Sequence, residues 1–298
     1  MAFETKATIA TFGGQLLKLS HQSTSTKTPM AVSVFLPPPS SSSSSSASSS
    51  PGPVPVLLYL SGLTCTPDNC TEKGFLHAAA AALGLAVVYP DTSPRGAGVD
   101  GEDASYDFGS GAGFYVDATE APWSANYNMY SYVQRELLPS LFADGALGAR
   151  LDASRVSITG HSMGGHGALT LYLKNPDFYK SVSAFAPICN PSCCPWGEKA
   201  FAGYLGPNRE TWAAHDATAL VAGETWKGVD LKALVDVGTA DNFYQQGQLL
   251  PENFEVAARG NGVTGLTVRY QENYDHSYYF ISTFAKDHVE HAAKYLLN

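Results

Sequence analysis

Apolar residues along this chain follow two alternating patterns: short unbroken runs, and longer segments in which they recur at helical spacing. The short runs, bounded by glycine, proline or polar residues, predict buried strands, and the longer segments predict helices. Residues 127–142 show the helical pattern by placing on one face Met129, Tyr132, Val133, Leu137 and Leu141. The predicted strands are 54–61, 85–90, 155–160, 181–187, 231–238 and 266–272, and the predicted helices are 71–84, 127–142, 164–174, 247–260 and 277–297.

The regular alternation of strands and helices predicts an α/β fold. Strands that are apolar throughout are typical of a mainly parallel central sheet with helices on both faces. Residues 14–23 and 30–37 also suit strands, but no helical segment separates them. We therefore expect these two strands to form an antiparallel N-terminal hairpin at one edge of the sheet.

One segment breaks the pattern, a run of proline and serine from Pro37 to Pro53. It contains almost nothing that could be buried, so it predicts a disordered surface loop at about residues 38–53. Too little chain precedes it to fold alone. We therefore expect a single domain over residues 1–298, with this loop inserted in it.

Charge and cysteine content narrow the range of functions. The formal net charge is −9 and no basic cluster is visible, which argues against binding to nucleic acid or to an anionic membrane. The first ten residues do not resemble a secretory signal, and no apolar run approaches the ~18 residues of a membrane span. The five cysteines are an odd number without a C-x-x-C pair. Reduced thiols in the cytoplasm, and no metal site, are expected.

Gly160-His161-Ser162-Met163-Gly164 matches the pattern G-x-S-x-G. A predicted strand runs into this pentapeptide and a predicted helix follows it at once. This is the nucleophile elbow of the α/β-hydrolase fold, which holds a serine at a sharp turn. The alternative is a tight glycine turn carrying an ordinary surface serine. The surrounding strand and helix favour Ser162 as a nucleophile.

Two histidines flank Ser162, but neither is well placed to be its base. His161 is adjacent at a turn, so its side chain should point away from the serine, and His166 should face into the protein from the helix. We expect both to be packed or supporting residues. His288 and His291 lie three residues apart on the last helix, and without a third ligand we expect an exposed helix face.

The acid and the base should follow later strands, because the order in this fold is serine, acid, histidine. Asp236 lies inside the strand 231–238, whereas Asp241 lies just past its carboxyl end. His276 lies in the loop after the strand 266–272 and is predicted to be the base, with Asp241 as its acid. Asp275 is a weaker rival for the acid, since adjacent side chains seldom face each other. Such a triad hydrolyses acyl compounds through an acyl-enzyme.

The oxyanion formed in that reaction needs two backbone donors. In this fold one is the amide after the nucleophile, here Met163. The other comes from a loop after an earlier strand, and Gly62 makes Leu63 the expected donor. Cys65 should lie close by, either as a small packed thiol or as a thiol that modulates activity.

At this point the chain resembles a known family, the S-formylglutathione hydrolases, also called esterase D. The resemblance covers nearly the whole chain and is carried by "SGLTCT", "YPDTSPRG", "GEDASYDFGSGAGFYVDAT", "GHSMGGHGAL", "KSVSAFAPICNP", "CPWGEKAF", "GQLLPENF" and "YDHSYYF". The serine tract departs from it. The resemblance implies a cytosolic thioesterase that cleaves S-formylglutathione to formate and glutathione without a cofactor, and a homodimer is typical of such proteins. It also implies the residues Ser162, Asp241, His276, Leu63, Met163 and the thiol-sensitive Cys65.

Other functions remain open at this stage. A general short-chain carboxylesterase or an acyltransferase would use the same residues, and a receptor could keep them without catalysis. Residues 189–206 lie where this fold often places a segment that covers the substrate. Trp196 and Lys199 in that segment are candidate glutathione contacts, although a packing role would explain them equally well.

Overall fold

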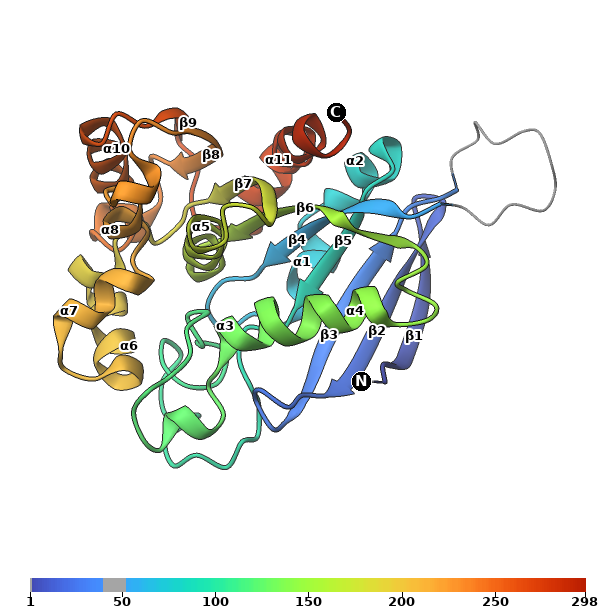
Figure 1. Cartoon of the computed structure of the whole chain (residues 1–298), viewed down its shortest axis with the longest axis horizontal. Helices are drawn as coiled ribbons and strands as arrows, with labels where there is room; N and C mark the ends of the chain where they lie inside the picture. The colour runs from blue at the N-terminus through green and yellow to red at the C-terminus, as the bar shows by residue number, and fades with distance from the viewer. Residues whose placement is uncertain (1, 40–51) are drawn as a thin grey trace.

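The computed structural model describes residues 2–39 and 52–298, and its strands form one nine-stranded sheet within those residues (Figure 1). The order across the sheet is β1-β2-β3-β5-β4-β6-β7-β8-β9. Neighbouring strands are antiparallel from β1 through β2 and β3 to β5. They are parallel from β5 through β4, β6, β7 and β8 to β9. The strands are β1 (Glu4–Thr11), β2 (Gly14–Gln22), β3 (Pro29–Leu36), β4 (Val54–Leu60), β5 (Ala86–Pro90), β6 (Leu151–His161), β7 (Tyr179–Phe185), β8 (Asp230–Gly238) and β9 (Thr264–Gln271).

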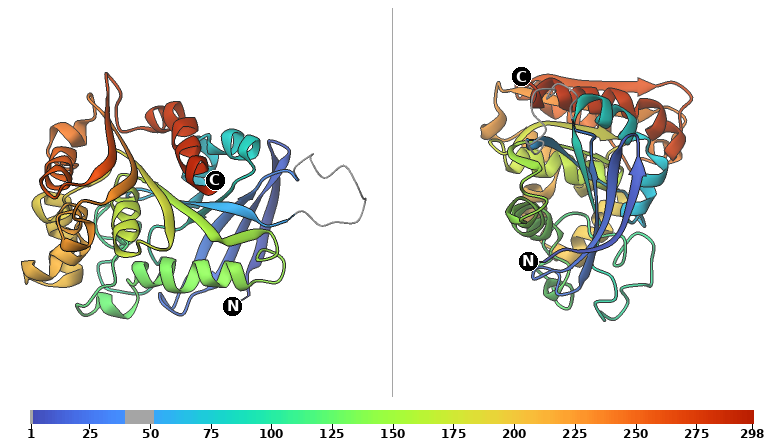
Figure 2. Two further views of the ribbon diagram at one scale, coloured as in Figure 1. Left: turned by 45° about the horizontal axis from the view of Figure 1, so that its top comes forward. Right: turned by 90° about the vertical axis from the view of Figure 1, so that its right-hand side faces the viewer.

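Helices cover both faces of the sheet (Figure 2). On one face α11 packs on β6, β7 and α2, with α1 beside them. On the other face α5 packs on β6 and β7, and α8 joins it to α10. The helices are α1 (Pro67–Lys73), α2 (Leu76–Leu83), α3 (Met129–Ser131), α4 (Leu138–Ala143), α5 (Met163–Lys174), α6 (Pro195–Leu205), α7 (Arg209–Trp212), α8 (Ala217–Val221), α9 (Asn242–Gln245), α10 (Pro251–Gly260) and α11 (Tyr278–Leu296).

This arrangement confirms the predicted α/β-hydrolase fold, a mainly parallel sheet flanked by helices with an antiparallel N-terminal hairpin. The hairpin itself, β2 with β3, is present, but it does not form the sheet edge, because β1 pairs with the outer side of β2. Most side chains of β1 are exposed on both sides of the strand. It therefore carries no apolar alternation by which the sequence could reveal it.

Two predicted helices differ in detail. The helix expected at 71–84 is interrupted at Phe75, which has a left-handed backbone (φ 57°) and begins α2 after α1 has ended at Lys73. The helix expected at 127–142 is present as α3 and α4, with a π-helical segment Tyr132–Leu137 between them. Its predicted apolar face is fully buried in the core.

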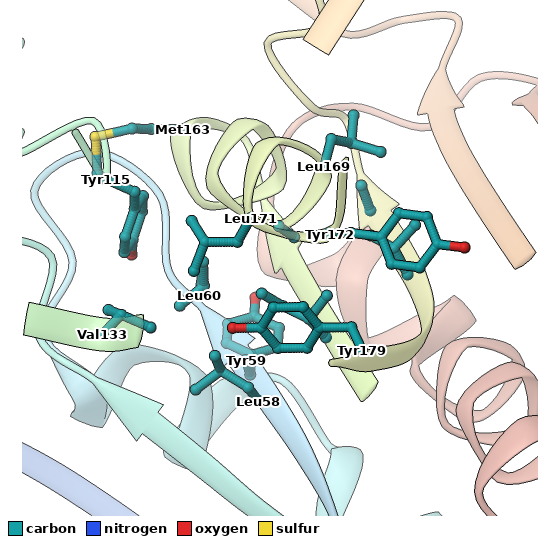
Figure 3. Close-up of a cluster of buried hydrophobic side chains, with 14 of the residues drawn as sticks. Leu58, Tyr59, Leu60, Tyr115, Val133, Met163, Leu169, Leu171, Tyr172 and Tyr179 are labelled. Carbon is teal, nitrogen blue, oxygen red and sulfur yellow. The ribbon is translucent and has the colours of Figure 1, made fainter. Parts of the chain in front are cut away.

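The hydrophobic core lies around α5, which is buried along almost its whole length (Figure 3). Leu60 at the end of β4 and Tyr115 pack against the first turns of this helix, whose first residue is Met163. The helix lies so close to β4 that a Cβ at Gly164 would come 2.0 Å from the carbonyl oxygen of Leu60. Only glycine permits this approach, and the approach fixes the first turn of α5 above the sheet.

Most of the predicted disordered loop at about 38–53 falls on residues 40–51, which lie outside the described residues. Across the described ranges, none of the helices combines the length and the apolar character required of a membrane span. In the same part of the chain, no group of three or more His, Cys, Asp or Glu side chains is placed to hold a metal ion.

Candidate active site

Ser162 occupies the sharp turn between β6 and α5, as the motif predicts. Its backbone lies at φ 58° and ψ −120°, a conformation that few residues other than glycine adopt. The turn is held by its main chain, because the Ser162 N–H donates to Phe185 O at 2.9 Å and its carbonyl accepts from His166 N at 3.0 Å. The serine is thus fixed at the carboxyl edge of the sheet, where loops from neighbouring strands converge.

Asp241 lies just past β8 and caps α9. One carboxylate oxygen accepts from Phe243 N at 2.8 Å and from Tyr244 N at 3.3 Å, and the side chain is fully buried. The other oxygen faces Nδ1 of His276 at 2.5 Å. These contacts use both oxygens, so the carboxylate is fixed in place with one oxygen facing Nδ1 of the imidazole.

His276 reaches this carboxylate from the loop between β9 and α11. The two loops are joined by the main chain, since Ala240 N donates to Tyr274 O at 2.9 Å and Thr239 N to Gln271 O at 3.0 Å. Asp275, the weaker candidate for the acid, instead accepts from the backbone N–H and the hydroxyl of Ser277. The structure therefore pairs His276 with Asp241, whereas Asp275 binds Ser277, the residue that caps α11.

Ser162 and His276 share a cavity of about 220 Å³. Most of its exposed lining is apolar. Such a lining suits an uncharged acyl group better than a charged ligand. The residues around the cavity are Gly62, Leu63, Thr64, Cys65, Tyr106, His161, Ser162, Trp196, Phe243 and His276.

The two candidate oxyanion donors lie on either side of Ser162. Met163 is the first residue of α5, where the backbone amide has no partner within the helix. Gly62 lies so close that a Cβ there would come 3.1 Å from the Cβ of Ser162, which brings the adjacent Leu63 to the cavity wall. Leu63 thus lies at the cavity wall beside Gly62, and Met163 follows Ser162 directly in the chain, as expected of the two candidate donors.

The loop that carries Leu63 continues to Cys65, whose main chain is firmly anchored. The carbonyl of Cys65 accepts from Thr92 Oγ1 at 2.6 Å and from Arg95 Nη2 at 3.0 Å. Arg95 is itself held by the buried carboxylate of Asp91. The Cys65 thiol lines the cavity 3.9 Å from the hydroxyl of Tyr278, and burial raises its pKa. The thiol is therefore mainly protonated at neutral pH.

Of the two candidate glutathione contacts, only one reaches the cavity. Trp196 on α6 lines it, donates from Nε1 to Tyr106 Oη at 3.1 Å, and packs on Phe243. Lys199, one turn further along, pairs with Asp107 and is absent from the lining residues. The structure thus places Trp196 at the site and Lys199 in a surface ion pair.

The flanking histidines also differ from each other. His166 is fully buried and contacts Phe114 O through Nε2 at 3.0 Å, as expected for a packed residue. His161 does not point away from the site, as the sequence suggested, but lines the cavity and lies against the ring of His276. The turn at Ser162 directs the side chains of His161 and Ser162 toward the same cavity.

The prediction of an exposed face for His288 and His291 is wrong for His288. Its ring is fully buried, stacks on Phe185 and contacts Asp236 Oδ2 through Nε2 at 3.1 Å. Asp236 also binds Arg269, so an ion pair lies beneath the loop that carries Asp241. Strand spacing alone could not reveal this pairing, because its members come from three elements.

Three cavity residues were missed by sequence reasoning, namely Tyr106, Phe243 and Thr64. Phe243 carried a usable signal, since it lies two residues after the predicted acid on a loop that must pass the base. Tyr106 lies in an irregular segment whose path no periodicity defines.

The chain is similar to known esterases. The model of the Esterase family matches residues 23–291. The S-formylglutathione hydrolase of Rattus norvegicus is 55% identical over 240 residues, which are 80% of this chain and 83% of the relative. That of Paracoccus denitrificans is 45% identical over 296 residues, 99% of each chain.

Solved structures extend the comparison. An S-formylglutathione hydrolase from Agrobacterium tumefaciens superposes with a TM-score of 0.88 at 46% identity, over 99% of this chain and 100% of that one. A ferulic acid esterase superposes with a TM-score of 0.68 at 18% identity, over 96% of this chain and 100% of that one. The second similarity concerns the fold alone.

Proposed function

The chain belongs to the Esterase family and, within it, to the S-formylglutathione hydrolases, and we propose that it hydrolyses S-formylglutathione to formate and glutathione. One observation carries the proposal most directly. Nδ1 of His276 meets the buried carboxylate of Asp241 at 2.5 Å, at a cavity that also holds Ser162. A serine, a histidine and an acid arranged in this way perform acyl transfer.

In the first half of the reaction Ser162 attacks the formyl carbon. His276 accepts the hydroxyl proton at Nε2, while Asp241 holds Nδ1 and stabilises the imidazolium that forms. The amides of Leu63 and Met163 donate to the oxygen of the tetrahedral intermediate. When the carbon–sulfur bond breaks, glutathione leaves as a thiol with the proton from His276, and the formyl group remains as an ester on Ser162.

In the second half a water molecule replaces glutathione. His276 removes a proton from this water, which attacks the formyl ester, and Ser162 recovers its proton as formate leaves. The base must be neutral at the start of each half-reaction, because only a neutral imidazole can accept the proton.

The size of the cavity favours a small acyl group. About 220 Å³ is below the ~300–1,000 Å³ typical of pockets that enclose a drug-sized ligand. A formyl group fits beside Ser162, whereas the tripeptide must extend outward past the mouth. Trp196 and Phe243, packed 4.6 Å apart, form one wall and limit the length of the acyl chain.

The nucleophile is tested by Ser162→Ala, which should lower kcat with S-formylglutathione by about 10⁴–10⁶. Ser157→Ala serves as a matched control, because Ser157 is buried in β6, the strand that leads to Ser162, but bonds Ser181 away from the cavity. This control variant should leave kcat unchanged. A loss below tenfold for Ser162→Ala would contradict the assignment. His276→Ala should be more severe than His161→Ala or His166→Ala.

The acyl specificity is tested with formyl, acetyl and butyryl thioesters of glutathione. The highest kcat/KM is expected for the formyl compound, and a preference for butyryl would indicate a general short-chain carboxylesterase instead. Product analysis with added alcohols tests the acyltransferase alternative, for which the acyl group would appear on the alcohol rather than as free acid.

The resemblance to the S-formylglutathione hydrolases implies that the reaction takes place in the cytoplasm. The same resemblance implies a homodimer. Sedimentation equilibrium would test the dimer, and a monomer at micromolar concentration would contradict it. The proposed chemistry would not be affected, because every residue of the cavity comes from one chain.

A further inference from the structure

The imidazole of His276 contacts two other aromatic rings. The ring of His161 has its centroid 4.4 Å away at an interplanar angle of 46°. The ring of Phe243 has its centroid 4.8 Å away and meets the imidazole at 84°, a T-shaped contact. We call His161 and Phe243 together the aromatic clamp. Both residues line the cavity beside Ser162.

His161 is an unusual residue for such a place. Only 7% of it is exposed, and neither ring nitrogen has a partner that meets hydrogen-bond geometry within residues 2–39 and 52–298. Burial lowers its pKa well below the usual range and the charge of a protonated His276 lowers it further, whereas the nearby backbone of His276 acts in the opposite direction. A neutral ring without a well-formed hydrogen bond acts on its neighbour mainly by packing.

Phe243 is held in place from behind. Its backbone N–H donates to Asp241 Oδ1 at 2.8 Å, so the residue that contacts the base also orients the acid. The indole of Trp196 packs on its ring at 4.6 Å, and Trp196 is in turn bonded to Tyr106. The ring of Phe243 therefore has little freedom to move away from His276.

The contact with Asp241 alone leaves the imidazole free to tilt about the Nδ1–Oδ2 line. Packing against the rings of His161 and Phe243 restricts that tilt. We propose that His161 and Phe243 position the imidazole of His276 for proton transfer with Ser162, a role that rests on the proposed function.

The clamp is tested with His161→Ala and His161→Phe. Alanine removes one ring, and a misplaced catalytic group costs on the order of 10²-fold in rate, so kcat should fall by about that factor with little change in KM. Phenylalanine restores a ring without nitrogens and should recover most of the lost rate. His77→Ala is the matched control, because His77 is also buried, stacks on Phe35 at 4.5 Å and lies outside the cavity lining.

A second readout separates positioning from folding. The proton shared by His276 and Asp241 should give a far-downfield NMR signal, which His161→Ala and Phe243→Ala should broaden or shift and His77→Ala should leave in place. Two results would overturn the proposal. One is a kcat for His161→Ala within threefold of the wild type, and the other is a loss in His161→Phe equal to that in His161→Ala.

The rate of labelling by a fluorophosphonate probe distinguishes failure of the clamp from failure of the proposed function. Labelling needs Ser162 activated by its base but no particular acyl substrate. A wild-type protein that labels rapidly yet does not cleave S-formylglutathione would refute only the function. A His161→Ala variant that labels as fast as the wild type would refute only the clamp.

Discussion

The buried ion pair between Asp236 and Arg269 predicts a stability that depends on pH in a defined way. Burial alone would raise the pKa of Asp236, but hydrogen bonds from His288 and Arg269 outweigh it and lower the pKa from 3.8 to about 2. Each unit of pKa corresponds to about 1.4 kcal/mol, so the ionised carboxylate contributes about 2 kcal/mol to folding. Asp236→Asn keeps the shape of the side chain and should lower the free energy of unfolding by at least that amount at neutral pH.

The effect should diminish in acid. Because the folded-state pKa lies below the unfolded value of 3.8, the stabilisation is complete at neutral pH and is lost as the pH falls through about 2. At pH 3 about half of the difference between Asp236→Asn and the wild type should therefore disappear. Urea denaturation followed by tryptophan fluorescence at pH 7, 5, 4 and 3 measures this difference.

Asp287→Asn is the matched control for the same experiment. Asp287 contacts the same guanidinium at 2.8 Å, but its side chain is 41% exposed. Its loss should cost less than about 1 kcal/mol. Equal effects of Asp236→Asn and Asp287→Asn at pH 7 would contradict the importance of burial. A difference between Asp236→Asn and the wild type that is the same at pH 3 and pH 7 would contradict the role of the charge.

Three further predictions concern the cavity. Gly62→Ala places a Cβ 3.1 Å from Ser162 Cβ and 3.2 Å from His161 O, so kcat should fall about 10–10²-fold with stability nearly retained, as measured by steady-state kinetics and thermal unfolding. Trp196→Ala shortens one wall of the cavity and should raise the ratio of butyryl to formyl kcat/KM, whereas Lys199→Ala should leave that ratio unchanged. Equal changes in the two variants would indicate that Lys199 also acts at the site. Iodoacetamide at neutral pH should alkylate the exposed Cys193 before Cys65, whose pKa burial raises, and peptide mass spectrometry over time would reveal the reverse order.

The sequence was sufficient for the parts of the fold that depend on burial. The strands β4 to β8 are apolar because both faces are covered, and the face of the helix around Val133 repeats at helical spacing because one side is buried. Strand β1 escaped prediction because backbone hydrogen bonds, not burial, hold it at the sheet edge. The break at Phe75 had a local signal that the prediction passed over, since Gly74 ends α1 as its C-cap residue.

The same distinction applies to the candidate site. Ser162, Asp241 and His276 could be located because each follows the carboxyl end of a recognisable strand, and parallel strands bring those ends together. The orientation of His161 could not be predicted, because one strained backbone angle at the neighbouring serine decides it. The role of His288 was hidden for another reason, since its partner Asp236 lies fifty-two residues away along the chain.

The order of strands has a practical consequence for handling the protein. The residues of the cavity come from the ends of the strands β4 to β9 and the segments that follow them, whereas β1 and β2 lie toward one edge of the sheet and contribute none of them. The outward side chains of β1 are largely exposed. Cysteines or linkers introduced on that strand would anchor the molecule to a solid support with the cavity mouth facing solution. Immobilisation through Tyr270 on β9, although it is also an exposed edge residue, would strain the strand that leads into His276.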